Sequence, residues 1–194
     1  YVTAELHSGR FFKKDAPRLS LKTVSDSKLP ILTMGGLTIM PDCSIDDMVI
    51  SETSVLVLPG ADTWNDPKHG ANIEKAGELL SLGATVCAIC GATTALASFG
   101  LLDHRPHTSN GPGFLEMFSP GYKGQSFYID RPSVADNNLI TASSTGALPW
   151  AKQIIEHLGV FEANTLEAWY EYFRTGEPER FFALMQTLPH SRDH

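Results

Sequence analysis

One cysteine, Cys90, stands where an apolar segment of the sequence changes into a helical one. Residues 85–89 are apolar, as expected of a buried strand, and residues 92–99 are mostly small and favour a helix. A tight strand-to-helix turn strains its central residue and excludes bulky neighbours, a condition that Ala88 and Gly91 satisfy. The pattern predicts a nucleophile elbow that presents the Cys90 thiol for covalent catalysis. The alternative is that Cys90 is a small packing residue.

The other two cysteines, Cys43 and Cys87, do not extend this chemistry. Cys87 and Cys90 have the C-x-x-C spacing of redox pairs and zinc sites. On a strand, however, side chains three positions apart point to opposite faces, and the sequence has no second C-x-x-C. We therefore expect Cys87 to be a buried small hydrophobe, and we expect no metal and no cofactor.

A second glycine-containing turn follows another apolar strand. Residues 54–58 form a continuous apolar run that ends abruptly at Pro59-Gly60. Ligands of parallel sheets bind at the carboxyl ends of the strands, where this turn would face the elbow. The backbone N–H groups of Gly60, Ala61 and Gly91 are thus candidates for stabilising an oxyanion. The alternative for this turn is an ordinary loop.

Short apolar strands alternate with amphipathic helices along the chain, which is typical of an α/β protein with a mostly parallel sheet. The sequence indicates one domain, 1–194, without repeats or linkers. We expect strands at 19–24, 31–34, 37–42, 54–58, 85–89, 127–130 and 139–142, and helices at 1–12, 71–80, 92–99, 148–158 and from 164 onward.

Taken together, these segments resemble the PfpI family, also called intracellular protease I-like or parkinsonism-deglycase-like, of the class I glutamine amidotransferase-like superfamily. The resemblance implies a flavodoxin-like three-layer sandwich with Cys90 at the elbow, and a homodimer. It is carried by Gly35-Gly36 through Pro41-Asp42, Leu58-Pro59-Gly60-Ala61, Ala88-Ile89-Cys90-Gly91, Gly100-Leu101-Leu102 and Leu139-Ile140-Thr141-Ala142.

The chain departs from the family pattern at its acid–base residues. Many members have a histidine directly after the cysteine, where this chain has Gly91. Others have a histidine in the loop after the elbow helix, where Asn110 matches and His107 lies three residues earlier. We expect His107 to move protons, and its alternative is a surface loop histidine. No His-x-Glu occurs, so true glutaminase activity is not expected.

The resemblance also implies a first strand and an acidic site residue before Tyr1, both outside the sequence. Glu5 is not assigned to that role, because its place within a helix predicts a solvated side chain.

Besides Asn110, two further side chains are candidates for the pocket wall. Trp64 follows the Pro59-Gly60 turn, and Ser143 follows the strand predicted at 139–142. Their alternatives are surface packing for Trp64 and helix capping for Ser143.

Composition limits the partners. The formal net charge of -7 argues against nucleic acid and anionic membranes. No apolar run approaches the roughly 20 residues needed to span a bilayer, and no secretory signal is evident, so we expect a cytoplasmic protein.

The predicted function is a cysteine-dependent hydrolase or amidotransferase-like enzyme that uses Cys90 on a small carbonyl, amide or nitrile-like substrate. The alternatives are a non-enzymatic stress-response protein that senses oxidation through Cys90, or a relative that keeps only the fold.

Overall fold

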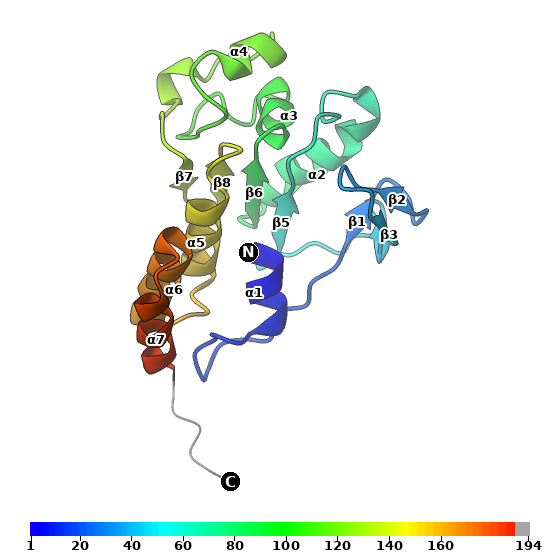
Figure 1. The fold of residues 1–194 in the computed structure, drawn as a ribbon. Helices are drawn as coiled ribbons and strands as arrows, with labels where there is room; N and C mark the ends of the chain where they lie inside the picture. The colour runs from blue at the N-terminus through cyan, green and yellow to red at the C-terminus, as the bar shows by residue number, and fades with distance from the viewer. Residues whose placement is uncertain (189–194) are drawn as a thin grey trace. The chain divides into compact units, whose positions relative to one another are not determined.

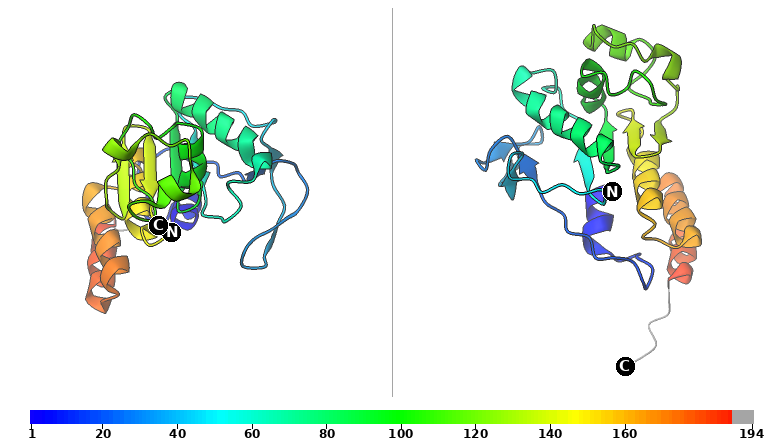
Figure 2. Two further views of the ribbon diagram at one scale, coloured as in Figure 1. Left: turned by 90° about the horizontal axis from the view of Figure 1, so that it is seen from above. Right: turned by 180° about the vertical axis from the view of Figure 1, so that it is seen from behind.

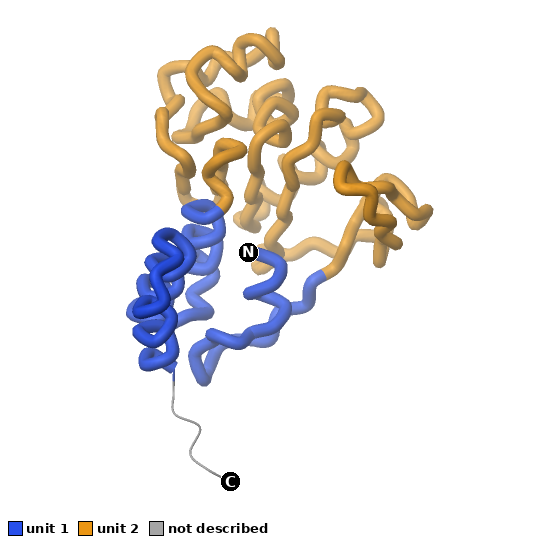
Figure 3. Tube along the Cα trace, in the orientation of Figure 1, with its two compact units in different colours: residues 1–21, 148–194 blue, residues 22–147 orange. Residues whose placement is uncertain are grey.

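The computed structural model describes residues 1–188 and divides into two compact units (Figure 3). The central unit comprises residues 22–147, and the terminal unit joins residues 1–21 to the chain from 148 onward. The single domain expected from the sequence stays a prediction. Within the described residues, no helix has the length and apolar character needed to cross a membrane.

The central unit is built on a four-stranded sheet in the order β5-β6-β8-β7 (Figure 1). Its strands are β5 (Val55–Leu58), β6 (Thr85–Ile89), β7 (Ser133–Asp136) and β8 (Leu139–Ala142). β6 pairs in parallel with β5 on one side and β8 on the other, whereas β7 is an antiparallel edge strand. The predicted α/β class with a mostly parallel sheet is confirmed.

Two helices pack against β6, one of the two inner strands of this sheet (Figure 2). They are α2 (Gly70–Ser81), which follows the 3-10 turn η1 (Pro67–His69), and α3 (Ala92–Ser98). α2 buries Ile73, Ala76 and Leu79, which recur with the helical period and form one face. Most of α3 is buried, and its alanines and threonines allow close packing against the strand that carries the elbow.

A glycine turn joins β2 (Ile31–Leu32) and β3 (Thr38–Ile39) into an antiparallel hairpin, in which the strands predicted at 31–34 and 37–42 are each only two residues long. Gly36 has a φ of 79°, which few residues other than glycine adopt. The strand predicted at 19–24 is wrong over most of its length, because only β1 (Val24–Ser25) forms, in parallel with β4 (Cys43–Ser44).

The segment between α3 and β7 is mostly loop. It contains the short helix α4 (Phe114–Phe118) and the 3-10 turn η2 (Gln125–Phe127). The strand predicted at 127–130 is therefore wrong, apart from one isolated bridge between His107 and Tyr128. Phe127 and Ile129 are 36% and 37% exposed, and none of the four residues is fully buried.

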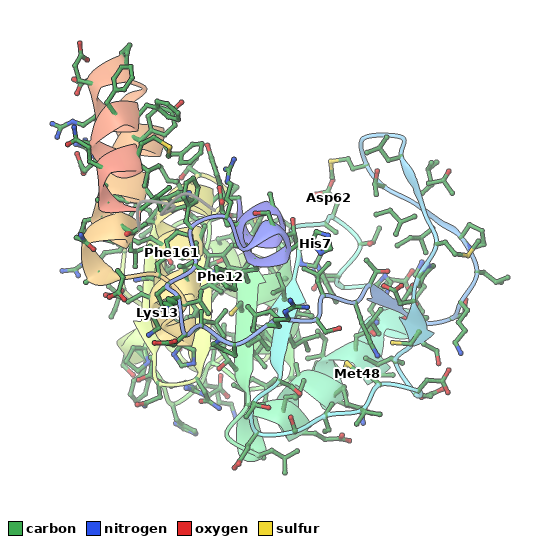
Figure 4. All side chains as sticks on the ribbon, turned by 90° about the horizontal axis from the view of Figure 1, so that it is seen from below. His7, Phe12, Lys13, Met48, Asp62 and Phe161 are labelled. Carbon is green, nitrogen blue, oxygen red and sulfur yellow. The ribbon has the colours of Figure 1, made fainter. Side chains whose placement is uncertain are left out.

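The terminal unit is helical. It contains α1 (Val2–Ser8), α6 (Ala163–Thr175), α7 (Pro178–Thr187) and all of α5 (Ala147–Leu158) except its first residue. Phe12 and Phe161 lie beside Lys13 in Figure 4, with the two phenyl rings 6.1 Å apart. The Lys13 N–H donates to the Val160 carbonyl at 2.8 Å, so the chain after α1 is held to the segment before α6.

Glu5 on α1 is buried rather than solvated, which corrects the expectation from the sequence. Its side chain is 2% exposed. Both carboxylate oxygens accept from the Arg10 guanidinium, at 2.6 and 2.9 Å, and Trp169 Nε1 donates to one of them at 3.1 Å. The sequence pattern did not reveal the contact between Glu5 and Trp169, because the two residues are 164 positions apart.

Candidate active site

Cys90 lies in the turn between β6 and α3, with a strained backbone. Its φ of 58° is unusual for a residue with a side chain. The turn is fixed on both sides, because the Cys90 N–H donates to the Ala142 carbonyl at 2.9 Å and its carbonyl accepts from the Thr93 hydroxyl at 2.7 Å. This is the geometry expected of an elbow that presents its side chain beyond the end of the strand.

The Pro59-Gly60 turn approaches the elbow closely, as two glycines show. A Cβ at Gly60 would lie 3.1 Å from the Cβ and 3.8 Å from the Sγ of Cys90. A Cβ at Gly91 would collide with the backbone carbonyl of Ala61. The three residues expected to form an oxyanion site thus lie around Cys90, while that role itself stays a prediction.

Asn110 is the side chain that the structure brings to the cysteine sulfur. Its Nδ2 donates to Cys90 Sγ at 3.4 Å, and its Oδ1 accepts from the Ser144 N–H at 2.8 Å. Because the backbone N–H can only donate, this second bond fixes which end of the amide faces the sulfur. The amide is therefore oriented to stabilise negative charge on sulfur or on an atom bound to it.

A buried pair of hydroxyls, one of which bonds the Cys90 carbonyl, lies next to the elbow. Thr93 Oγ1 lies 2.6 Å from Ser109 Oγ, and both residues are nearly inaccessible. Ser109 immediately precedes Asn110, so the pair connects the elbow to the loop that carries the amide. Sequence reasoning missed this contact, for which the only local signal was a threonine three residues after the cysteine.

His107 is fully buried, and the hydrogen-bond partners of its ring nitrogens do not include the Cys90 sulfur. Nδ1 lies 2.7 Å from the Arg105 carbonyl and Nε2 lies 2.6 Å from the Tyr122 hydroxyl. Since a carbonyl only accepts, Nδ1 carries the hydrogen and Nε2 accepts from Tyr122 in the neutral ring. Burial lowers the pKa of His107. Its acid–base role stays a prediction, whereas the alternative of a surface histidine is wrong.

The two predicted wall residues border different cavities of the central unit. Ser143 lines a cavity of about 250 Å³ together with Asn110. Trp64 lines another, of about 500 Å³, and its indole N–H donates to the Pro59 carbonyl at 2.7 Å. Ser143 thus borders the space next to the Asn110 amide that donates to Cys90. Trp64 instead stabilises the Pro59-Gly60 turn that approaches the elbow.

The remaining cysteines differ from Cys90. All three cysteines are free, and Cys87 is completely buried, which raises the pKa of its thiol. The expectation that Cys87 is a packing residue is confirmed by this burial. Within residues 1–188, no group of three or more histidine, cysteine, aspartate or glutamate side chains is arranged to hold a metal ion.

Known proteins share this arrangement of elements. The chain is 45% identical over 188 residues to a Bacillus subtilis protein named "Uncharacterized protease YoaZ", covering 97% of this chain and 90% of that protein. It is 32% identical over 136 residues to "Protein DJ-1alpha" of Drosophila melanogaster, covering 66% and 59% of the two chains.

Solved structures agree. The crystal structure of a thiJ/pfpI family protein from Bacillus anthracis superposes with a TM-score of 0.94 at 45% identity, covering 97% of this chain and 89% of that one. A DJ-1 superfamily protein from Agrobacterium tumefaciens gives a TM-score of 0.68 at 28% identity, covering 79% and 81%. The model of the DJ-1/PfpI family matches residues 10–157. With the fold, the elbow and these relatives in agreement, the chain belongs to the DJ-1/PfpI family.

Proposed function

We propose that the protein is a cysteine-dependent enzyme of the hydrolase or amidotransferase-like type, acting on a small carbonyl, amide or nitrile-like substrate through Cys90. The observation that carries the proposal is the hydrogen bond from the Asn110 amide to Cys90 Sγ at a strained elbow. Strain and oriented donors concentrate at active sites because they prepare the site before the substrate arrives. The protease name of the Bacillus subtilis relative is consistent with hydrolytic chemistry.

In the proposed reaction, the Cys90 thiolate attacks the substrate carbon. A carbon–sulfur bond forms while the π electrons of the carbonyl move to its oxygen. That oxyanion accepts hydrogen bonds from the N–H groups of Gly60, Ala61 or Gly91 and from Asn110 Nδ2. When the oxyanion collapses, the bond to the leaving group breaks and the leaving group takes a proton from a water molecule. The hydroxide left by that water attacks the thioester carbon, the carbon–sulfur bond breaks, and the acid product and the Cys90 thiolate are released.

The test uses a small activated ester and a small amide as substrates. Cys90→Ser replaces the nucleophile and should abolish turnover, whereas Cys43→Ser should leave it unchanged. Asn110→Ala should lower kcat/KM by roughly 10- to 100-fold, because it removes one oriented donor. Turnover that persists in Cys90→Ser would overturn the proposal.

A second candidate function is oxidation sensing in a stress response. It is favoured by the hydrogen bonds of His107, whose two ring nitrogens bind Arg105 and Tyr122 rather than Cys90. Oxidation of a thiolate to sulfenic or sulfinic acid needs no histidine. After mild peroxide treatment, mass spectrometry should then find added oxygen on Cys90 but not on buried Cys87. Equal oxidation of all three cysteines would contradict a sensor.

We also propose that the protein acts as a homodimer in the cytoplasm. Three free cysteines suit a reducing compartment. The support for the dimer is the β2-β3 hairpin, whose apolar side chains Ile31 and Leu32 in β2 and Met34 and Leu37 in the turn are exposed. Exposed apolar side chains that gather in one segment are typical of association sites.

A further inference from the structure

We propose that the cavity beside Asn110 binds a carboxylate group of the substrate through the Arg131 guanidinium. This substrate cavity is lined by Ser109, Asn110, Gly111, Asp130, Arg131, Pro132, Ser143, Ser144 and Thr145. The inference rests on the proposed function of Cys90 and adds the class of substrate, a small anionic acid with a reactive carbon near its carboxylate.

The substrate cavity adjoins the nucleophile through a shared side chain. Asn110 lines the cavity and also donates to Cys90 Sγ at 3.4 Å. The Asn110 oxygen accepts from the N–H of Ser144, which also lines the cavity. A small molecule in this space would therefore lie next to the group that touches the sulfur.

The sheet itself holds the cavity walls in place. Because β7 and β8 are antiparallel, the loop before β7 and the loop after β8 meet at one end of the sheet. The Ser143 N–H donates to the Pro132 carbonyl at 3.0 Å, and the Thr108 hydroxyl donates to the Arg131 carbonyl at 2.7 Å. The backbone that carries Arg131 is thus fixed, while its side chain remains exposed.

The groups around the cavity favour a carboxylate. Arg131 takes part in none of the ion pairs recorded for residues 1–188, and a guanidinium can bind both oxygens of a carboxylate at once. Ser143 and Thr145, whose hydroxyl oxygens lie 3.1 Å apart, add donors. Asp130 is the one opposing charge among the lining residues, and a volume of about 250 Å³ suits a molecule of only a few heavy atoms.

The experiment compares two probes of similar size, iodoacetate with its anionic carboxylate and iodoacetamide with a neutral carboxamide. In each, the Cys90 thiolate displaces iodide, so a carbon–sulfur bond forms as the carbon–iodine bond breaks. Alkylation rates are followed by mass spectrometry on full-length protein with Cys43→Ser, and the readout is the iodoacetate-to-iodoacetamide rate ratio at Cys90. The ratio cancels changes in the intrinsic reactivity of the thiol.

We expect Arg131→Gln to lower this ratio about threefold to fivefold, as for one partly exposed charge interaction. Asp130→Asn should raise the ratio, because it removes the opposing charge. The ratio should be higher in Arg131→Lys than in Arg131→Gln, because lysine keeps the positive charge. Lys123→Gln removes the same unit charge from an exposed residue outside the cavity, and should leave the ratio unchanged.

The outcomes separate this inference from the proposed function. If Cys90 reacts with iodoacetamide but Arg131→Gln leaves the ratio unchanged, or Lys123→Gln lowers it equally, the carboxylate site is overturned while the nucleophile stands. If iodoacetamide modifies Cys90 no faster than Cys43 in the unsubstituted protein, the proposed function itself fails. Native circular dichroism of each variant shows that a lowered ratio does not come from misfolding.

Discussion

Gly91 is the residue on which the geometry of the elbow most depends. Any side chain at this position meets the Ala61 carbonyl, and that carbonyl belongs to the backbone turn that also approaches Cys90. Gly91→Ala should therefore force the two turns apart and lower the free energy of unfolding by about 1–3 kcal/mol, as overpacking does elsewhere. Urea unfolding followed by circular dichroism measures this change.

Gly121→Ala is the matched control, because a Cβ at Gly121 would have no heavy atom within 4 Å. It should change the free energy of unfolding by less than about 0.5 kcal/mol, as is usual for exposed substitutions. Equal effects of the two substitutions would show that the contact between the elbow and the Pro59-Gly60 turn is not a constraint.

Prediction of single residues from the sequence worked where the signal was local. The small residues around Cys90 and Gly60 indicated close backbone approach, and the structure places them together. The pairs Thr93–Ser109 and His107–Tyr122 were missed, because their members are 16 and 15 residues apart across loops without periodicity. Such pairs depend on how loops fold back, which hydrophobic patterning does not encode.

At the scale of elements, the loop before Asn110 is anchored by His107. Its imidazole is hydrogen-bonded to the Tyr122 hydroxyl. The centroid of the imidazole lies 5.6 Å from that of the Tyr122 ring and 5.9 Å from that of the Tyr128 ring. Burial lowers the pKa of His107 from its usual value of 6.5. The unfolded chain thus takes up this proton more readily than the folded protein, so the free energy of unfolding should fall as the pH drops below about 6.5.

His107→Gln tests this linkage. The variant should be less stable at pH 7, because it loses buried hydrogen bonds, but its free energy of unfolding should decline less steeply between pH 7 and 5. His104→Gln, at an exposed residue of the same loop, should keep the pH dependence of the unsubstituted protein. The measurement is a series of urea unfolding curves across this pH range, and an unchanged slope in His107→Gln would refute the linkage.

Elements were predictable in proportion to the burial of their apolar residues. β8 was predicted with its observed bounds, and all four of its residues are buried. β7 was not predicted: it is an edge strand whose residues Ser133–Asp136 include one large apolar side chain, and its last two residues are less buried than its first two. The run at 127–130 was predicted as a strand because it is apolar, but none of its residues is fully buried.

For the whole molecule, the exposed apolar side chains of the β2-β3 hairpin carry the prediction of a homodimer. Leu32, Met34 and Leu37 are each at least 70% exposed, an arrangement that costs solvation free energy in a monomer. A second copy offers the same apolar surface, and a two-fold axis can bring the two hairpins together. Exposed strand edges strengthen this tendency, since they leave backbone groups free to pair.

The combined variant Ile31→Asp with Leu37→Asp should convert the dimer to a monomer, because both side chains lie on one face of the hairpin and two charges there disrupt an apolar contact. Sedimentation equilibrium should show the dissociation constant rising by at least about tenfold, the equivalent of roughly 1.4 kcal/mol. Leu82→Asp changes another exposed leucine, at the end of α2, and should leave the dimer intact. A monomer in the unsubstituted protein, or equal dissociation in Leu82→Asp, would show that the hairpin is not the dimer contact.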